Sequence, residues 1–157
     1  MKLATWPTMN MFYLFGGTAL ALHLSHRQSQ DLDFFTRDPL EILPQIEQID
    51  KKFAEFSQVE WQINTREQLQ CRLDDVSITM LAYPFPHGFE YHQWHGIAVA
   101  DVRDIATQKV YTIGRRTQAR DYLDLHAILT HGMLSLDELI RYAQMTYSGV
   151  FFPRLFL

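Results

Sequence analysis

The strongest constraint on the fold of this chain is a pair of glycines followed by two closely spaced aspartates. The apolar residues 11–15 favour a buried strand, and Gly16-Gly17 breaks it with a turn. Thr18 can cap a helix that runs to about His26. Backbone N–H groups at a glycine turn and at a helix N-terminus bind phosphate well. The segment therefore predicts a strand, a turn and a helix that together offer a phosphate-binding backbone.

The next strand, expected over residues 31–36, carries both aspartates on one face. Side chains alternate along a strand, so Asp31 and Asp33 point one way and Leu32 and Phe34 point to the buried side. Like charges at this separation are unfavourable unless a cation neutralises them, and Mg²⁺ (or Mn²⁺) prefers such oxygen ligands. Either motif alone is typical of an ordinary turn or a solvated strand face. Their joint spacing predicts a site for a metal ion and a triphosphate.

The remaining pattern places strands first and helices last. Apolar spacing predicts a helix over 38–56 and a strand over 59–63, and a hairpin over 68–83 turns at Asp74-Asp75. Three helices follow, over 101–115, over 117–131, and from a capping box at Ser135. This order indicates an α+β domain with a helical C-terminal part. The apolar segment 151–157 is expected to pack on the core or a partner, or to mark a shortened chain.

Composition limits the function classes. A chain of 157 residues with 47% hydrophobic residues is expected to form one domain, 1–157, with a core over about 11–100 and helices over about 101–150. The net charge of -4 argues against broad nonspecific nucleic-acid binding. Cys71 is the single cysteine, so a reducing cytoplasm is expected. Residues 9–24 imitate a signal peptide poorly, because glycines and His23 interrupt them, and they are too short to span a membrane.

Two blocks of residues give the chain a recognisable resemblance. Gly16 to Leu20, His26-Arg27, Ser29 and Asp31 to Phe35 resemble the nucleotidyltransferase family of AbiEii/AbiGii-type toxins, within the DNA polymerase β-like superfamily. The later block of that family is matched by Asp104-Ile105-Ala106, Lys109, Arg115-Arg116, Arg120-Asp121 and Asp124-Leu125, and Tyr83-Pro84 matches a strand end. The resemblance covers about residues 11 to 130. It implies a mixed sheet flanked by helices.

The resemblance also implies a role for each matching position. Asp31 and Asp33 would be catalytic and hold the metal, Lys109 would reach the triphosphate, and Asp121 would be a catalytic or substrate-orienting carboxylate helped by Asp124. The implied nucleotide contacts are Gly16, Gly17, Thr18, Arg27, Lys109 and Asp124. The alternative for the two later aspartates is a helical ion network, in which Arg116 pairs with Asp121 and Arg120 pairs with Asp124.

Superfamily enzymes often have a third carboxylate on a neighbouring strand, and this chain departs from that pattern. Thr79 takes the carboxylate's place, or Ser77 if the alignment slips, and neither is an anionic ligand. The general base is therefore unassigned. Relatives also usually continue with more C-terminal helices.

Three histidines, His87, His92 and His95, fall in one aromatic stretch with Tyr91 and Trp94. Their spacing fits no common zinc motif. A surface loop, or a loop that contacts the acceptor, is the expected interpretation.

The predicted function is metal-dependent transfer of a nucleoside monophosphate from an NTP to an acceptor. The family context implies a bacterial toxin of a toxin–antitoxin or abortive-infection system. Its acceptor would be RNA, tRNA especially, or a protein, and it would have a cognate antitoxin and no membrane partner. Two alternatives stay open: nucleotidylation of a small molecule such as an aminoglycoside, and a degenerate module that binds nucleotide or a partner without turnover. Fold analogy alone does not separate these three.

Overall fold

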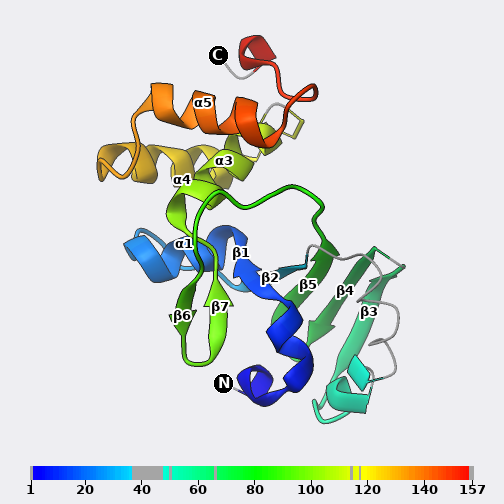
Figure 1. The fold of residues 1–157 in the computed structure, drawn as a ribbon. Coiled ribbons are helices and arrows are strands. Elements are labelled where there is room, and N and C mark those ends of the chain that lie inside the picture. The colour runs from blue at the N-terminus through cyan, green and yellow to red at the C-terminus, as the bar shows by residue number, and fades with distance from the viewer. Residues whose placement is uncertain are drawn as a thin grey trace.

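A computed structural model describes residues 2–36, 48–49, 51–65, 67–113, 115–116 and 118–155. Its centre is a mixed seven-stranded sheet in the order β3-β4-β5-β2-β1-β7-β6. Three helices, α3, α4 and α5, stack together at one end of the molecule, and α1 lies beside the sheet (Figure 1). The α+β architecture predicted from the order of elements is confirmed.

The sheet strands are β1 (Tyr13–Phe15), β2 (Asp31–Thr36), β3 (Val59–Asn64), β4 (Gln68–Leu73), β5 (Val76–Ala82), β6 (His92–Trp94) and β7 (Ile97–Val99). The α-helices described over their whole length are α1 (Gly16–Leu24), α3 (Val102–Ile113), α4 (Ala119–Thr130) and α5 (Leu136–Thr146). Short 3-10 segments cover Lys2–Thr5, Pro7–Met11 and Pro153–Leu155.

Strand β2 occupies the middle of the sheet and carries the aspartate pair. It runs antiparallel to β1 and parallel to β5, while β1 runs parallel to β7. Phe34 is fully buried and Phe35 nearly so, which fixes the far half of β2 in the core. A strand anchored in this way holds its polar side chains in a set position, as a catalytic site requires.

The β4–β5 hairpin was predicted and is confirmed. Leu73 pairs with Val76, so Asp74-Asp75 is the two-residue turn, and Asp74 has a positive φ of 52°. Aspartate tolerates this left-handed conformation better than most residues. The hairpin register continues with Gln70 opposite Thr79, which matters for the site described below.

The C-terminal helices agree with the sequence prediction. Ser135 forms the expected capping box with Glu138 at the start of α5. Gly132 adopts a left-handed φ of 68° after α4, as a helix-terminating glycine does. At the C-terminal end, Phe151 is buried in the core and Phe152 is 58% exposed, whereas Phe156 and Leu157 lie outside the described residues.

Three details differ from the prediction. Helix α1 begins at Gly16 instead of after Thr18, and it ends at Leu24 because Ser25 turns left-handed with a φ of 51°. Residues 48–49 and 51–53 are helical, while most of the helix predicted over 38–56 lies outside the described residues. The histidine stretch is not a plain loop, since it contains the β6–β7 hairpin, whose turn residues His95 and Gly96 both have positive φ. Strands of three residues are too short to show alternation in a sequence.

Within the part of the chain that the structure describes, no helix has the length and apolar character needed to cross a membrane.

Candidate active site

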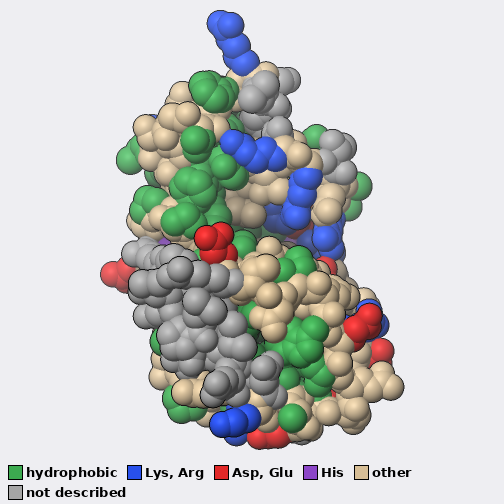
Figure 2. All heavy atoms as spheres, turned by 90° about the vertical axis from the view of Figure 1, so that its right-hand side faces the viewer, with side chains coloured by type: hydrophobic (Ala, Val, Ile, Leu, Met, Phe, Trp, Pro, Cys, Tyr) green, Lys and Arg blue, Asp and Glu red, His purple; other side chains and the backbone are tan. Residues whose placement is uncertain are grey.

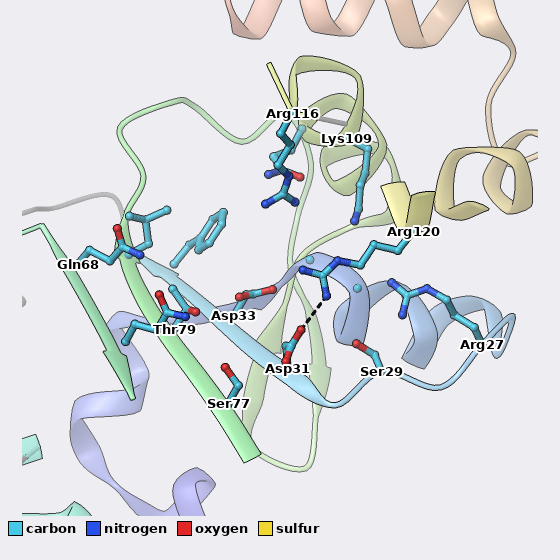
Figure 3. A pocket seen from close by; sticks show the side chains of 16 residues that line it. Arg27, Ser29, Asp31, Asp33, Gln68, Ser77, Thr79, Lys109, Arg116 and Arg120 are labelled. Atoms are coloured by element: carbon cyan, nitrogen blue, oxygen red, sulfur yellow. Dashed lines mark hydrogen bonds and ion pairs between the residues drawn. The ribbon is translucent and has the colours of Figure 1, made fainter. Parts of the chain in front are cut away.

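A pocket of about 310 Å³ opens above the aspartates of β2. Gly16 and Gly17 of α1 border it, and it has two chemically different walls. One wall carries the cationic side chains of Arg27, Lys109, Arg116 and Arg120. The other carries uncharged side chains from β4 and β5, namely Gln68, Gln70, Ser77, Thr79 and Leu81. The two aspartates lie between the walls (Figure 3).

Both expected carboxylates face this pocket. Asp31 and Asp33 line it, whereas Leu32 between them lines a separate apolar cavity. The alternation predicted from the sequence is therefore observed. The strand register places Asp33 beside Thr79 and Asp31 beside Ser77. Thr79 thus stands next to Asp33 on the neighbouring strand, at the position where the third carboxylate was expected.

The pKa of Asp33 is raised above its usual value. Burial is the main cause and the like charge of Asp31 is the next, while a hydrogen bond with Thr79 and the charges of Lys109 and Arg120 oppose the rise. A cation bound nearby would stabilise the ionised form of such a carboxylate.

The donor set fits a divalent ion that shares its ligands with phosphate. No group of three or more His, Cys, Asp or Glu side chains converges on a metal site among the described residues. Mg²⁺ commonly takes one or two carboxylates and fills its other positions with phosphate oxygens and water. Asp31 and Asp33 would provide that pair, and the Asp31 side chain, which lines the pocket, is 43% exposed.

Position 16 requires a glycine, because the Asp33 carboxylate approaches its backbone closely. Its φ is 67°, and a Cβ at this position would lie 2.5 Å from Asp33 Oδ2. Gly16→Ala therefore has to displace the Asp33 carboxylate in addition to straining the backbone. We expect the variant to lose nucleotide–Mn²⁺ binding in calorimetry.

Gly132→Ala is the matched control for that variant. Gly132 has nearly the same φ, 68°, and a Cβ added there would have no neighbouring atom within 4 Å. Both variants should lose stability from backbone strain, about 1–2 kcal/mol, but only Gly16→Ala should lose binding. Equal binding by the two variants would contradict the placement of Asp33 against Gly16.

The other two residues expected to contact phosphate, Gly17 and Thr18, have different surroundings. Gly17 borders the pocket, and its Cβ would lie 2.5 Å from Nη2 of Arg27, so the guanidinium rests directly on the glycine. Thr18 is placed differently from the prediction. Its hydroxyl donates to the backbone carbonyl of Asp31, and the residue lines the apolar cavity on the other side. Thr18 therefore fastens α1 to β2 and is not among the residues that line the charged pocket.

Asp121 and Asp124 are fully buried on α4 and support the cationic wall from behind. Lys109 Nζ lies 2.7 Å from Asp121 Oδ1 and 2.7 Å from Asp124 Oδ2. Neither aspartate is among the residues that line the pocket. Their carboxylates hold Lys109 in position. The catalytic and nucleotide-binding roles that the resemblance implied for them stay predictions.

The same two carboxylates fix further residues. Asp124 Oδ1 accepts from Arg27 Nε at 2.6 Å and lies 2.8 Å from His26 Nε2. Asp121 Oδ2 accepts from Arg116 Nε at 3.1 Å. The alternative of an ion network is thus partly observed, because Arg116 pairs with Asp121 as expected. Arg120 does not pair with Asp124, since its guanidinium reaches Asp31 at 2.9 Å.

Charge pairing lowers the pKa of both buried aspartates. Burial would raise the pKa of Asp124, but hydrogen bonds from Arg27, His26 and Lys109 outweigh it and hold the pKa well below the usual range. For Asp121, burial is likewise outweighed, here by Lys109 and Arg116. Both groups therefore stay ionised and hold the cations at neutral pH.

The three histidines do not converge. His87 is buried against the Tyr13 and Phe15 rings, with Nδ1 3.5 Å from Asp104 Oδ2. His92 Nε2 lies 3.1 Å from Asp101 Oδ2, and His95 sits in the β6–β7 turn. None of them is among the residues lining the charged pocket. The prediction of a contact loop for the acceptor stays untested.

Several pocket residues were not singled out from the sequence. Gln68 and Gln70 reach the pocket only because the hairpin register places β4 beside β5. Arg116 and Arg120 stand in the later motif block and were expected only as ion-pair partners.

Lys and Arg side chains gather on the upper half of the molecular face shown in Figure 2.

Comparison with known sequences finds a family and a relative that match most of this chain. Residues 4–148 match the family model described as the nucleotidyl transferase AbiEii toxin of a type IV toxin–antitoxin system. An uncharacterized protein of Aquifex aeolicus (strain VF5), aq_aa25, is 32% identical over 155 residues, which is 96% of this chain and 73% of that protein.

Solved structures share the fold at low sequence identity. The antibiotic-resistance factor ANT(2″)-Ia superposes with a TM-score of 0.63 at 11% identity, over 87% of this chain and 82% of that one. MenT4, a nucleotidyltransferase toxin of Mycobacterium tuberculosis H37Rv, has a TM-score of 0.54 at 20% identity, over 85% of this chain and 55% of that one.

The mixed sheet, the glycine turn, the aspartate pair and the match along most of the sequence agree with one another. The chain belongs to the AbiEii family of nucleotidyltransferase toxins.

Proposed function

We propose that this chain uses Mg²⁺ (or Mn²⁺) to transfer a nucleoside monophosphate from an NTP to an acceptor bound in the same pocket. The observation that carries the proposal is one pocket in which Asp31 and Asp33 face four cationic side chains across a glycine turn. Carboxylates hold metal ions, and cations with exposed backbone N–H groups hold phosphates. An NTP with its metal supplies both kinds of ligand.

Each part of the pocket has a distinct task in this proposal. Asp31 and Asp33 would hold the ion together with phosphate oxygens, and Arg27 and Lys109 would bind the triphosphate above Gly16-Gly17. The bound ion supplies Lewis-acid stabilisation of charge on phosphate oxygens. Asp121 and Asp124 keep the cations aimed into the pocket, which spares the reorganisation that would otherwise accompany charge development.

The transfer itself is an in-line displacement. An acceptor oxygen forms a bond to the α-phosphorus, the bond between that phosphorus and the bridging oxygen of the β-phosphate breaks, and pyrophosphate leaves. The acceptor proton ends in solvent; Thr79 and Ser77 offer no carboxylate, so the base that first takes the proton is unassigned. The cationic wall offsets the charge that builds on the leaving phosphates, and the uncharged wall of β4 and β5 receives the acceptor.

The family membership supports a biological role for this reaction. The matching model describes a toxin of a type IV toxin–antitoxin system, and MenT4 is described as a nucleotidyltransferase toxin. We therefore assign the chain a cytoplasmic toxin role that a cognate antitoxin opposes. RNA, with tRNA foremost, or a protein would be the acceptor.

Two other functions have an observation in their favour. Transfer to a small cationic drug is supported by the shared fold of ANT(2″)-Ia, a structure of which is described as a complex with adenylyl-2″-tobramycin, and by the net charge of -4. A binding module without turnover is supported by Thr79 in place of a third carboxylate.

One labelling experiment separates these functions. The chain is incubated with Mg²⁺ and each α-labelled NTP, together with total tRNA, a cell extract or tobramycin. Label on tRNA or protein supports the proposal, label on tobramycin supports the small-molecule alternative, and metal-dependent binding without transfer supports the module. Asp31→Asn should abolish label transfer, whereas Asp75→Asn, in the exposed hairpin turn, should not.

A further inference from the structure

Arg120 contacts one of the two carboxylates assigned to the metal. Its Nη1 donates to Asp31 Oδ2 at 2.9 Å (Figure 3). The side chain of Arg120 is 51% exposed and that of Asp31 is 43% exposed. Water competes well for such a pair, so opening it costs at most about 1 kcal/mol.

The other cations of the pocket have different partners. Lys109 is held by Asp121 and Asp124, Arg27 by Asp124, and Arg116 by Asp121. These aspartates are fully buried and lie outside the pocket lining. Among the described cations that line the pocket, Arg120 is therefore the one whose carboxylate is also a proposed metal ligand.

The backbone beneath Arg120 is fixed, and its side chain is the part that can move. Arg120 is the second residue of α4, and the residue after it, Asp121, is anchored to Lys109 and Arg116. Nε of Arg120 donates to Gln118 Oε1 at 2.9 Å. Figure 3 shows the guanidinium extending from α4 into the space between Asp31 and the other cations. A rotation about the side-chain bonds suffices to turn it toward a ligand in that space.

From this geometry we infer that Arg120 exchanges partners, leaving Asp31 for the triphosphate when a metal ion binds to Asp31. The inference rests on the proposed function, because it requires metal and nucleotide in this pocket. A cation at Asp31 repels the guanidinium and takes its acceptor, while a triphosphate offers the guanidinium a new one. Arg120 is then a nucleotide-binding residue that couples the two ligands.

A thermodynamic consequence follows. Metal alone has to displace Arg120 without compensation, whereas metal with nucleotide gives Arg120 a replacement partner. The two ligands therefore bind cooperatively, and the coupling is reciprocal. Removing the Arg120 charge should strengthen binding of metal alone and weaken the coupling.

The test measures Mn²⁺ affinity by calorimetry with and without α,β-methylene-ATP. In this analogue a methylene group replaces the oxygen between the α- and β-phosphates, so nucleotidyl transfer does not occur. For Arg120→Gln we expect Mn²⁺ alone to bind about three- to fivefold more tightly, the size of an exposed ion pair. The gain in Mn²⁺ affinity that the nucleotide causes should shrink. Arg120→Lys should keep part of the coupling, because it keeps the charge without the planar fork.

Two comparison variants separate partner exchange from a general effect of charge. Arg116→Gln removes the same charge from the same wall but leaves Asp31 paired, so its effect on Mn²⁺ alone should be smaller. Arg72→Gln breaks an ion pair on the hairpin, with the fully exposed Asp75, and should change neither affinity.

The outcomes for the inference and for the proposed function are distinct. Equal Mn²⁺ affinities in wild type, Arg120→Gln and Arg116→Gln, with nucleotide binding intact, would overturn the exchange and leave the proposed function standing. An equal tightening in both pocket variants would show a general charge effect and also overturn it. Absence of any Mn²⁺ or nucleotide binding in wild type would overturn both.

Discussion

Asp33→Asn is expected to stop nucleotidyl transfer and leave the chain folded. Asp33 is one of two carboxylates assigned to the metal, and loss of a metal's charge stabilisation costs several kcal/mol in the transition state, about a thousandfold in rate. The amide keeps the shape of the side chain and still accepts the hydrogen bond from Thr79. Label transfer from an α-labelled NTP measures the loss.

The same variant should be as stable as wild type or more stable. The pKa of Asp33 is raised by burial and by Asp31, so the folded state binds its proton more readily than the unfolded state does. Ionising a group of this kind costs stability as the pH rises through its folded pKa. The neutral amide removes that cost at pH 7. Thermal unfolding at pH 7 checks this, and a large drop in melting temperature would show that Asp33 is a structural ion-pair partner instead.

Asp124→Asn, in contrast to Asp33→Asn, is expected to destabilise the fold strongly. Asp124 is fully buried, and its carboxylate meets His26, Arg27 and Lys109. Removing one partner of a buried ion network leaves cations uncompensated and costs about 3 kcal/mol or more, or roughly 6–12 °C in melting temperature. Thermal unfolding measures the change, with Asp75→Asn in the exposed turn as the control.

Acid should reproduce part of that loss in wild type. The pKa values of Asp124 and Asp121 are lowered in the folded state, so the unfolded state takes up their protons first. Stability that is present above the ordinary carboxyl pKa, about 3.9, is then lost as the pH falls below it. Unfolding curves between neutral pH and strong acid should show a smaller decline for Asp124→Asn. Parallel declines would contradict the charge network.

The parts of the fold predicted from the sequence are those with strong local signals. Alternation placed Asp31 and Asp33 on one face of β2, and the capping box located the start of α5. The β6–β7 hairpin was missed because its strands have three residues each, and the pairing that joins it to the sheet, β7 with β1, links residues far apart in the sequence. The first turn of α1 was misjudged because the Thr18 hydroxyl bonds to a carbonyl thirteen residues away instead of to its own helix.

The site was predictable for residues within a motif and less so for residues joined by packing. The carboxylates, the glycines, Arg27 and Lys109 were expected in the pocket, and all of them line it. For Asp121 and Asp124 the sequence left a substrate role and an ion network open, and the packing of α3 against α4 brings both carboxylates onto Lys109. Spacing along one helix does not show which side chain faces a cavity and which faces a neighbouring helix.

The central claim is that the α-phosphate moves to an acceptor and pyrophosphate leaves. Parallel reactions with α-labelled and γ-labelled forms of the same NTP test it most directly. We predict that the α-label appears on the acceptor, that the γ-label appears only in pyrophosphate in equal amount, and that both signals need Mg²⁺ or Mn²⁺ and Asp31. Transfer of the γ-label to the acceptor, or α-label transfer that persists in Asp31→Asn, would contradict the account.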